Sequence, residues 1–242
     1  MKKSGFIFFA VVIVIFTGGC VSSGSAVVLA QRDPIALVSV VSNWDINWKD
    51  EDSMDANSPG LFMGRHLRTD PDLVFVSNSE ELINTGEMTF RSVVAESKLI
   101  ELAEKETVLF SRAYGEAKIN KQQLRRKDVS PKNYRLIDYR DKKFPPALAN
   151  ETGIQRSMFV EFNFVKFMSS GISKTGNGRA EVNMVVIILD SRGKTVFRKT
   201  FSARSHSSIE VHAGTYSGTA LIELFESTIK EVCNDFMDHL KS

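Results

Sequence analysis

The sequence predicts an α/β domain in which helices pack on a mixed sheet, and three observations lead to this class. Residues 35–48 alternate apolar and polar side chains with a period of two, which is typical of a strand. Residues 158–203 contain three strand-like runs separated by turn formers, so they predict an antiparallel three-strand meander. Residues 219–240 carry apolar side chains at helical spacing, which predicts a long C-terminal amphipathic helix. Helices and strands in this order favour a layered α/β arrangement.

The first 20 residues have the composition of an export signal. Two lysines precede an apolar run over residues 6–16, and small residues lead from there to Cys20. A helix that crosses a membrane needs about 20 apolar residues, and this run is much shorter. We therefore expect residues 1–19 to be a signal peptide.

The residues before Cys20 resemble the lipobox of bacterial lipoproteins, in which a cysteine is acylated before cleavage. Gly18 and Gly19 match the pattern, whereas Thr17 stands where the family has an aliphatic residue. The resemblance implies that Cys20 begins the mature chain and anchors it in the cell envelope through acyl chains, facing the periplasm or the cell surface. Because Val21 follows, rather than the Asp of inner-membrane retention, the outer membrane is favoured. An ordinary secretory signal and an uncleaved membrane anchor are the alternatives.

Charge and cysteine content narrow the class of protein. The full sequence has 31 basic and 29 acidic residues, and loss of residues 1–19, which contain two lysines and no acidic residue, leaves 29 of each. A neutral surface argues against a nucleic-acid partner, which needs a concentrated basic face. Acylation of Cys20 leaves Cys233 without a partner, which excludes a disulfide scaffold. Residues 20–33 are expected to be a flexible tether and residues 34–242 one α/β domain.

The first strand and the loop after it contain the candidate ligand site. Residues 35–48 are read as one long strand, buried on both faces at first and on one face later, with Trp44 and Trp48 on the same face. Residues 49–72 are rich in turn formers and predict a long loop, of a kind that often binds ligands. The two tryptophans could line an apolar pocket under this loop and bind a lipid or a peptide. Ordinary core packing is the alternative.

Short helices and strands are expected to alternate over the middle of the chain. Ser79 is the expected N-cap of a helix over residues 79–97, because acidic residues fill its first turn. Prolines at the start and Gly153 at the end predict a helix over residues 145–152. The other expected elements are short strands over residues 73–76, 99–102 and 134–138, a helix over residues 105–114, and a polar, basic loop over residues 118–127.

The last third of the chain contains the predicted meander. Residues 158–168 are rich in aromatic and β-branched side chains, and residues 181–189 are almost continuously apolar, as in a central strand. The glycine-rich residues 169–178 are expected to form the turn between these two strands. A tight turn at residues 190–193 leads to the third strand, over residues 195–203.

This order of elements is similar to that of the lipoprotein group around the curli secretion pore and of the amino-terminal domain of the Tol–Pal translocation protein TolB. In those families a Tyr-x-Leu-Ile segment leads to a helix that ends in Gly, and a hairpin with an Asp-x-x-Gly turn follows. The matching residues are Tyr134, Leu136 and Ile137, then Gly153, then Asp190 and Gly193. The resemblance covers residues 134–240. It implies a fold and an envelope role, and it carries over no catalytic residue.

No catalytic or metal-binding motif is complete in the sequence. Ser217 lies one place too late for a nucleophile elbow, and His206 and His212 match no zinc spacing. The acidic residues 50–55 lack the alternation of a calcium loop. The basic residues 118–127 are expected to be solvated, with anionic lipid headgroups or an acidic partner as the alternative. We therefore expect no metal and no cofactor.

Three functions follow from these observations. The first is a lipid-anchored envelope protein that binds another protein or contributes to an assembly, without catalysing a reaction. The second is a periplasmic carrier of an apolar ligand, either a lipid or a peptide, that uses Trp44 and Trp48. An envelope hydrolase is the third, and it has the least support because no catalytic constellation is present.

Overall fold

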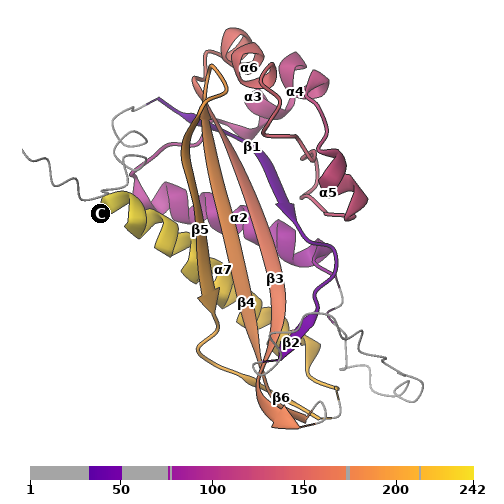
Figure 1. Cartoon of the computed structure of the whole chain (residues 1–242). Coiled ribbons are helices and arrows are strands. Elements are labelled where there is room, and N and C mark those ends of the chain that lie inside the picture. The colour runs from indigo at the N-terminus through magenta and orange to yellow at the C-terminus, as the bar shows by residue number, and fades with distance from the viewer. Residues whose placement is uncertain (1–32, 51–75, 77, 173–174, 213) are drawn as a thin grey trace, which may run out of the picture.

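The computed structural model describes residues 33–50, 76, 78–172, 175–212 and 214–242 (Figure 1). The expected signal peptide, the acylation site Cys20, the tether up to residue 32 and residues 51–72 of the expected loop lie outside the described residues. The expected strand over residues 73–76 also lies outside them, except for Val76.

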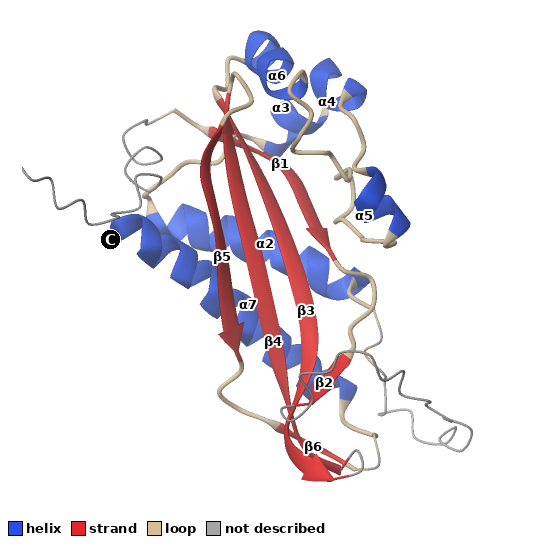
Figure 2. Cartoon of the chain, in the orientation of Figure 1, coloured by secondary structure: helices blue, strands red, loops and turns tan. Residues whose placement is uncertain are grey.

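A six-stranded mixed sheet forms the centre of the protein (Figure 2). The strands are β1 (Ile35–Ser42), β2 (Trp48–Asp50), β3 (Arg156–Ile172), β4 (Thr175–Asp190), β5 (Thr195–Arg204) and β6 (Ile209–Val211). The main path across the sheet runs β1-β3-β4-β5. β1 and β2 pair in parallel with β3, whereas β3, β4 and β5 are antiparallel and β6 pairs antiparallel with β4. The predicted mixed sheet and its antiparallel meander are confirmed.

Helices cover both faces of this sheet. They are α2 (Glu80–Ser97), α3 (Lys105–Leu109), α4 (Arg112–Glu116), α5 (Lys121–Arg125), α6 (Phe144–Thr152) and α7 (Gly218–Lys241). The two long helices α2 and α7 contact one another and lie on one face, whereas α3, α4 and α6 group at one end of the other face (Figure 1). No helix in the described ranges combines the length and hydropathy of a membrane span.

Two buried cores fill the spaces between the sheet and its helices. The larger core lies under α2 and α7, where Phe164 of β3 meets Phe225 of α7 edge to face at 5.8 Å between ring centroids. The smaller core joins β1, β3 and β4 to α3, α4 and α6. Because β1 lies between both cores, all eight of its residues are buried. The predicted amphipathic stripe on the C-terminal helix is confirmed, since it faces the larger core.

The expected long strand over residues 35–48 is wrong, because the strand is interrupted. β1 ends at Ser42 and β2 begins at Trp48. The Nδ2 of Asn43 donates to the carbonyl oxygen of Asp45 at 2.6 Å and turns the chain out of the ladder. Short amide side chains compete with backbone pairing in this way. The interruption leaves a gap at the edge of β3, which is where the candidate site lies.

The glycine-rich residues 169–178 are not a long turn, because β3 and β4 continue through most of them. Gly171 pairs with Gly176, and Gly178 pairs with Met168. Glycine at position 178 has a packing reason, since a Cβ there would lie 2.8 Å from the Trp48 ring. Glycine in a strand often marks such a close approach.

Two expected short strands are single bridges instead. Leu102 pairs with Ile35 alone, and Ile137 pairs with Ile119 alone. Both segments lie beside the sheet without extending it, so their apolar runs reflect packing against helices rather than ladder formation.

Side-chain caps account for two further differences in the middle of the chain. The helix expected over residues 105–114 is divided at Ser111, whose Oγ accepts a hydrogen bond from the Tyr114 N–H at 3.2 Å and starts α4. The basic segment expected as a loop contains α5, because the Oδ1 of Asn120 accepts from the N–H groups of Gln122 and Gln123 at 3.1 and 3.3 Å. Such caps satisfy amides at a helix start that lack an intrahelical partner.

Candidate functional site

The gap between β1 and β2 opens into a cleft of about 460 Å³ at the edge of the sheet. The chain between these strands, the segment after α5 and the edge of β3 form its walls. The lining residues are Asn43, Trp44, Asp45, Asn47, Lys49, Arg126, Asp128, Glu161, Phe162, Asn163, Phe164 and Val165. We call this space the strand-break cleft.

The side chain of Asn43 replaces a strand at the floor of the strand-break cleft. Its Oδ1 accepts from the Phe164 N–H at 2.8 Å, and its Nδ2 donates to the Phe164 carbonyl oxygen at 3.0 Å. Both backbone groups of Phe164 are therefore satisfied although no strand lies beside them. Buried backbone groups need such partners. The cleft is thus a fixed feature of the edge, and its other side chains are left to contact a ligand.

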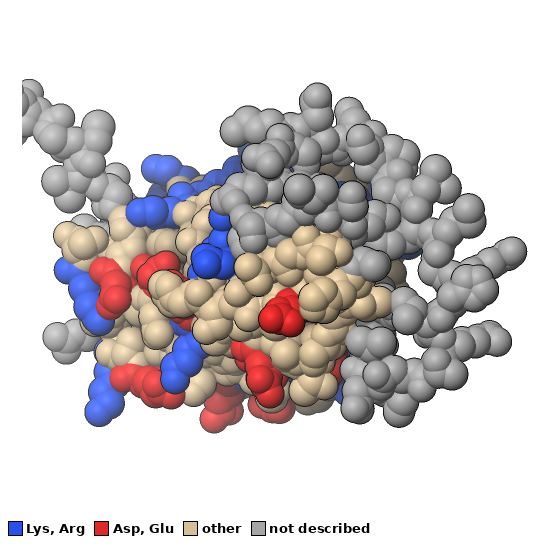
Figure 3. All heavy atoms as spheres, turned by 90° about the horizontal axis from the view of Figure 1, so that it is seen from below, with Lys and Arg blue, Asp and Glu red and all other residues tan. Residues whose placement is uncertain are grey.

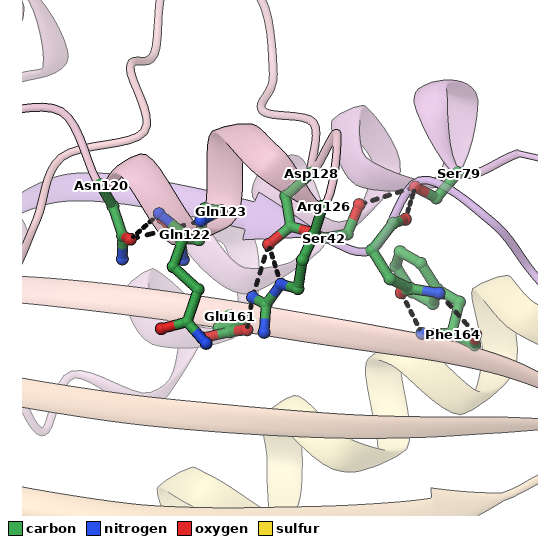
Figure 4. A network of polar contacts seen from close by, with 10 residues as sticks. Ser42, Ser79, Asn120, Gln122, Gln123, Arg126, Asp128, Glu161 and Phe164 are labelled. Carbon is green, nitrogen blue, oxygen red and sulfur yellow. Dashed lines mark hydrogen bonds and ion pairs between the residues drawn. The ribbon is translucent and has the colours of Figure 1, made fainter.

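A pair of serines fixes the start of α2 against the interrupted strand (Figure 4). The hydroxyl groups of Ser42 and Ser79 lie 2.8 Å apart, and Ser79 Oγ also donates to the carbonyl oxygen of Asn43. Ser79 is the N-cap of α2, as predicted, but its hydroxyl makes no capping bond. Asn78 Oδ1 instead accepts from the Glu80 N–H at 3.2 Å. The sequence identified this serine correctly and missed its role in holding the cleft.

Arg126 joins the segment after α5 to β3 across the strand-break cleft. Its guanidinium contacts Asp128 at 2.6 Å and Glu161 at 3.0 Å (Figure 4). Asp128 is buried, whereas the Arg126 side chain is 49% exposed. The hydrogen bonds that Arg126 donates to Asp128, together with the negative charge of that carboxylate, raise the pKa of Arg126. One face of the guanidinium is therefore held in place while much of the side chain remains accessible.

The cleft combines an aromatic side chain with fixed charges. Trp44 is partly exposed and lines it, and Arg126 lines it as well. Tryptophan and arginine are the residue types most enriched among those that dominate the energy of protein interfaces. Eight of the twelve lining residues are polar or charged, which fits a polypeptide better than a lipid chain. The described residues hold no group of three or more His, Cys, Asp or Glu that could bind a metal ion.

Trp48 lies apart from Trp44, although the sequence placed both on one face. Trp48 is not among the residues that line the strand-break cleft. Its ring meets Tyr216 edge to face, at 5.5 Å between centroids, and packs over Gly178. The strand interruption separates the two tryptophans, so only Trp44 is positioned for a ligand in this cleft.

A buried lysine next to Trp48 is a second candidate site, which the sequence analysis missed. Lys166 is 7% exposed and donates from Nζ to the Val76 carbonyl oxygen at 2.9 Å. The rings of Trp48 and Tyr216 lie 5.5 and 5.6 Å from the ammonium. Burial lowers the pKa of Lys166 to about 8. The sequence did contain a signal for this burial, because Phe162, Phe164 and Lys166 alternate along β3 and so share its buried face.

The remaining candidates from the sequence are not brought together into a site. His206 lies 3.4 Å from Glu231, whereas His212 lies 3.3 Å from Glu210. Ser217 caps α7 by accepting from the Ala220 N–H. These three side chains therefore have structural or surface roles.

Cys233 is fully enclosed in the larger core. It is 1% exposed, and burial raises the pKa of its thiol. A raised thiol pKa disfavours the reactive thiolate. The expected role as a small buried hydrophobe fits this environment.

No family model matches the chain, and no curated protein matches it. Among solved structures, the chain is similar to the LpoB C-terminal domain from Salmonella enterica, with 12% sequence identity and a TM-score of 0.29. The alignment covers 75% of this chain and 92% of that domain.

Proposed function

We propose that this chain is a lipid-anchored protein of the bacterial cell envelope that binds another protein through the strand-break cleft and catalyses no reaction. The lipobox resemblance at Cys20 supports the anchoring, and the residue following it favours the outer membrane. A flexible tether over residues 20–33 would let the domain reach a partner from its anchor.

One observation carries the binding proposal, namely that Trp44 and Arg126 lie in the walls of the same open cleft. Arg126 is held by Asp128 and Glu161, so little conformational entropy is lost when a partner docks against it. Asn43 already pairs with both backbone groups of Phe164 at the edge of β3, so we expect the partner to be recognised through side chains rather than by strand addition.

A carrier of an apolar ligand has less support. The lining of the strand-break cleft is mainly polar, and burial of its charged groups beneath a lipid chain would cost free energy. Trp48, which this function also requires, packs against Tyr216 instead. A hydrolase has the least support, because Arg126 engages both Asp128 and Glu161 and so leaves neither as a free acid or base in the cleft.

Site-specific photo-cross-linking tests the protein-binding function. A photoreactive amino acid replaces Asn163, which is exposed in the cleft, in the full chain produced in its native cell. We expect one discrete adduct with an envelope protein, and we expect Trp44→Ala to remove it. Phe110→Ala is the matched control, because Phe110 is an aromatic residue that is 81% exposed and does not line the cleft.

Thermal unfolding of each variant shows whether the fold is retained. An adduct that persists in a folded Trp44→Ala protein would contradict binding through the cleft. Absence of any adduct from position 163 would also contradict it. A lipid that copurifies with the wild type and is lost from Trp44→Ala would favour the carrier function instead.

A further inference from the structure

A basic surface around α5 is not used by the strand-break cleft. Residues 118–127 contain five cationic residues and no acidic one. At the lower end of the molecule, by contrast, acidic and basic side chains are interspersed (Figure 3). Lys121, Leu124, Arg125 and Lys127 are all exposed, and we call these four residues the α5 basic face.

Three cations of the α5 basic face are available to a ligand. The other two basic side chains of the segment are engaged, Lys118 with Asp141 at 4.0 Å and Arg126 with Asp128 and Glu161. None of the ion pairs within the described part of the chain includes the cations of the α5 basic face. Their charge is therefore not neutralised by the described residues.

The orientation of α5 places an apolar side chain among these cations. Gln123 is buried and faces β3 beside Phe159 and Glu161, so the opposite side of the helix faces outward. Residues three and four apart lie on one side of a helix, and Lys121, Leu124 and Arg125 have this spacing. Leu124 is 60% exposed. Surfaces that lie in a membrane interface combine Lys and Arg with exposed apolar side chains such as leucine, and the α5 basic face has one such leucine.

We propose that the α5 basic face rests on the anionic surface of a lipid bilayer. Lysine and arginine would contact the headgroups, and Leu124 would enter the interface between them. Figure 1 shows α5 outside the sheet, beside β1 and on the side away from the C-terminal end of α7. A helix on the outside of the fold can contact a flat lipid surface, whereas a protein partner that inserts a side chain would need a pocket.

This inference rests on the proposed anchoring at Cys20. The number of residues between Cys20 and the domain is consistent with the anchoring and with contact between α5 and the membrane. Cys20 and Asp33 are 13 residues apart, which allows a reach of at most about 45 Å. The eight residues of β1 span about 26 Å. β1 begins next to the tether. At its other end, the N–H of Ser42 donates to the carbonyl oxygen of Val129, which follows α5, so β1 spans the distance between the tether and the α5 segment. An anchored chain can therefore bring α5 to the membrane.

The effect of the three cations is large enough to measure. Each cation near an anionic leaflet favours the bound state by roughly fivefold, so three should favour it by on the order of a hundredfold. The attraction falls off within a Debye length, which is several times shorter at 0.5 M salt than in a dilute buffer.

A fluorescent label next to Leu124 tests the contact. The acylated full chain carrying Gln122→Cys, labelled with an environment-sensitive dye, is reconstituted in phosphatidylcholine vesicles with or without 30% phosphatidylglycerol. Gln122 is exposed, whereas Cys233 is buried and Cys20 is acylated, so the dye reacts at the new thiol. We expect a blue-shifted emission only with phosphatidylglycerol, and we expect 0.5 M NaCl to remove it.

Two variants, each with three cationic residues changed to Glu, show whether the contact depends on the α5 basic face or on net charge alone. Lys121→Glu with Arg125→Glu and Lys127→Glu should abolish the blue shift. The control changes Lys98, Lys194 and Lys230 to Glu, because these lysines are exposed and form no ion pair with the described residues, and it should retain the shift. Equal responses of the two triple variants would overturn the proposal. A shift that appears only when envelope proteins are added would also overturn it, in favour of a protein partner.

Intact mass of the reconstituted protein separates the two proposals. If the chain carries no acyl groups, the anchoring fails, and the same variants are compared by co-sedimentation with vesicles containing 30% phosphatidylglycerol. Weaker sedimentation of the α5 variant alone, by tenfold or more, would still support the α5 basic face. Equal sedimentation of both variants would overturn it.

Discussion

Lys166 should make the stability of the protein rise with pH above 7. Its ammonium is buried on the inner face of β3, and burial lowers its pKa to about 8 from the ordinary value of 10.5. Between these two values the unfolded chain binds more protons than the folded chain. The free energy of unfolding therefore increases as pH rises from about 8 to 10.5, and the increase is absent below pH 7.

The expected increase is about 1 kcal/mol between pH 7 and pH 9. Urea denaturation of the wild type and of Lys166→Met at pH 7, 8 and 9 measures it. Cys233 acts in the opposite direction, because burial raises its thiol pKa and the unfolded thiol ionises first. That effect subtracts a few tenths of a kcal/mol at pH 9 from both proteins, so their difference isolates Lys166.

The exposed residue Lys230 on α7 provides the control. Lys230→Met should follow the pH dependence of the wild type, whereas Lys166→Met should lose the increase. Equal pH slopes for the wild type and Lys166→Met would refute the reasoning, because they would show that burial does not shift the titration of Lys166.

Three further substitutions test contacts of the strand-break cleft, of the Trp48 ring and of the larger core, each by urea denaturation. Asn43→Ala removes both hydrogen bonds to the backbone of Phe164 and should lower the free energy of unfolding by about 1–3 kcal/mol; no loss would show that water replaces the amide. Gly178→Ala places a Cβ 2.8 Å from the Trp48 ring and should cost about 1–3 kcal/mol with a change in tryptophan fluorescence, whereas unchanged fluorescence would argue against this contact. Phe225→Ala empties a fully buried position and should cost about 3–5 kcal/mol; a cost below 1 kcal/mol would contradict its place in the core.

The sequence predicted those parts of the fold in which burial follows a simple period. The apolar stripe of α7 and the alternation along β3, β4 and β5 each depend on one buried face, which is readable in one dimension. Two turn glycines were also predictable. Gly153 ends α6 and Gly193 closes the hairpin, and both have a φ of 78°, which glycine adopts without strain.

The candidate site was only partly predictable, because long-range contacts form it. Trp44 was identified, but its separation from Trp48 depends on Asn43, whose side chain pairs with a strand residue 121 positions away. The glycine at position 178 reads as a turn former until the Trp48 ring is placed against it. No local pattern contains these contacts, since each joins elements that only the folded chain brings together.

The role of Arg126 in the candidate site was not predicted, for a related reason. In the sequence it is one of five cations in a basic segment. In the structure Asp128 and Glu161 hold it in the wall of the strand-break cleft, while the α5 basic face remains outward. Charge counting alone does not distinguish a cation that positions a site from one that is free to bind.

Intact mass of protein purified from its native cell tests lipid anchoring, on which the envelope function depends. We predict a chain that begins at Cys20 and carries acyl groups. A chain that still begins at Met1, or one that is cut elsewhere and lacks acyl groups, would contradict the anchored envelope function.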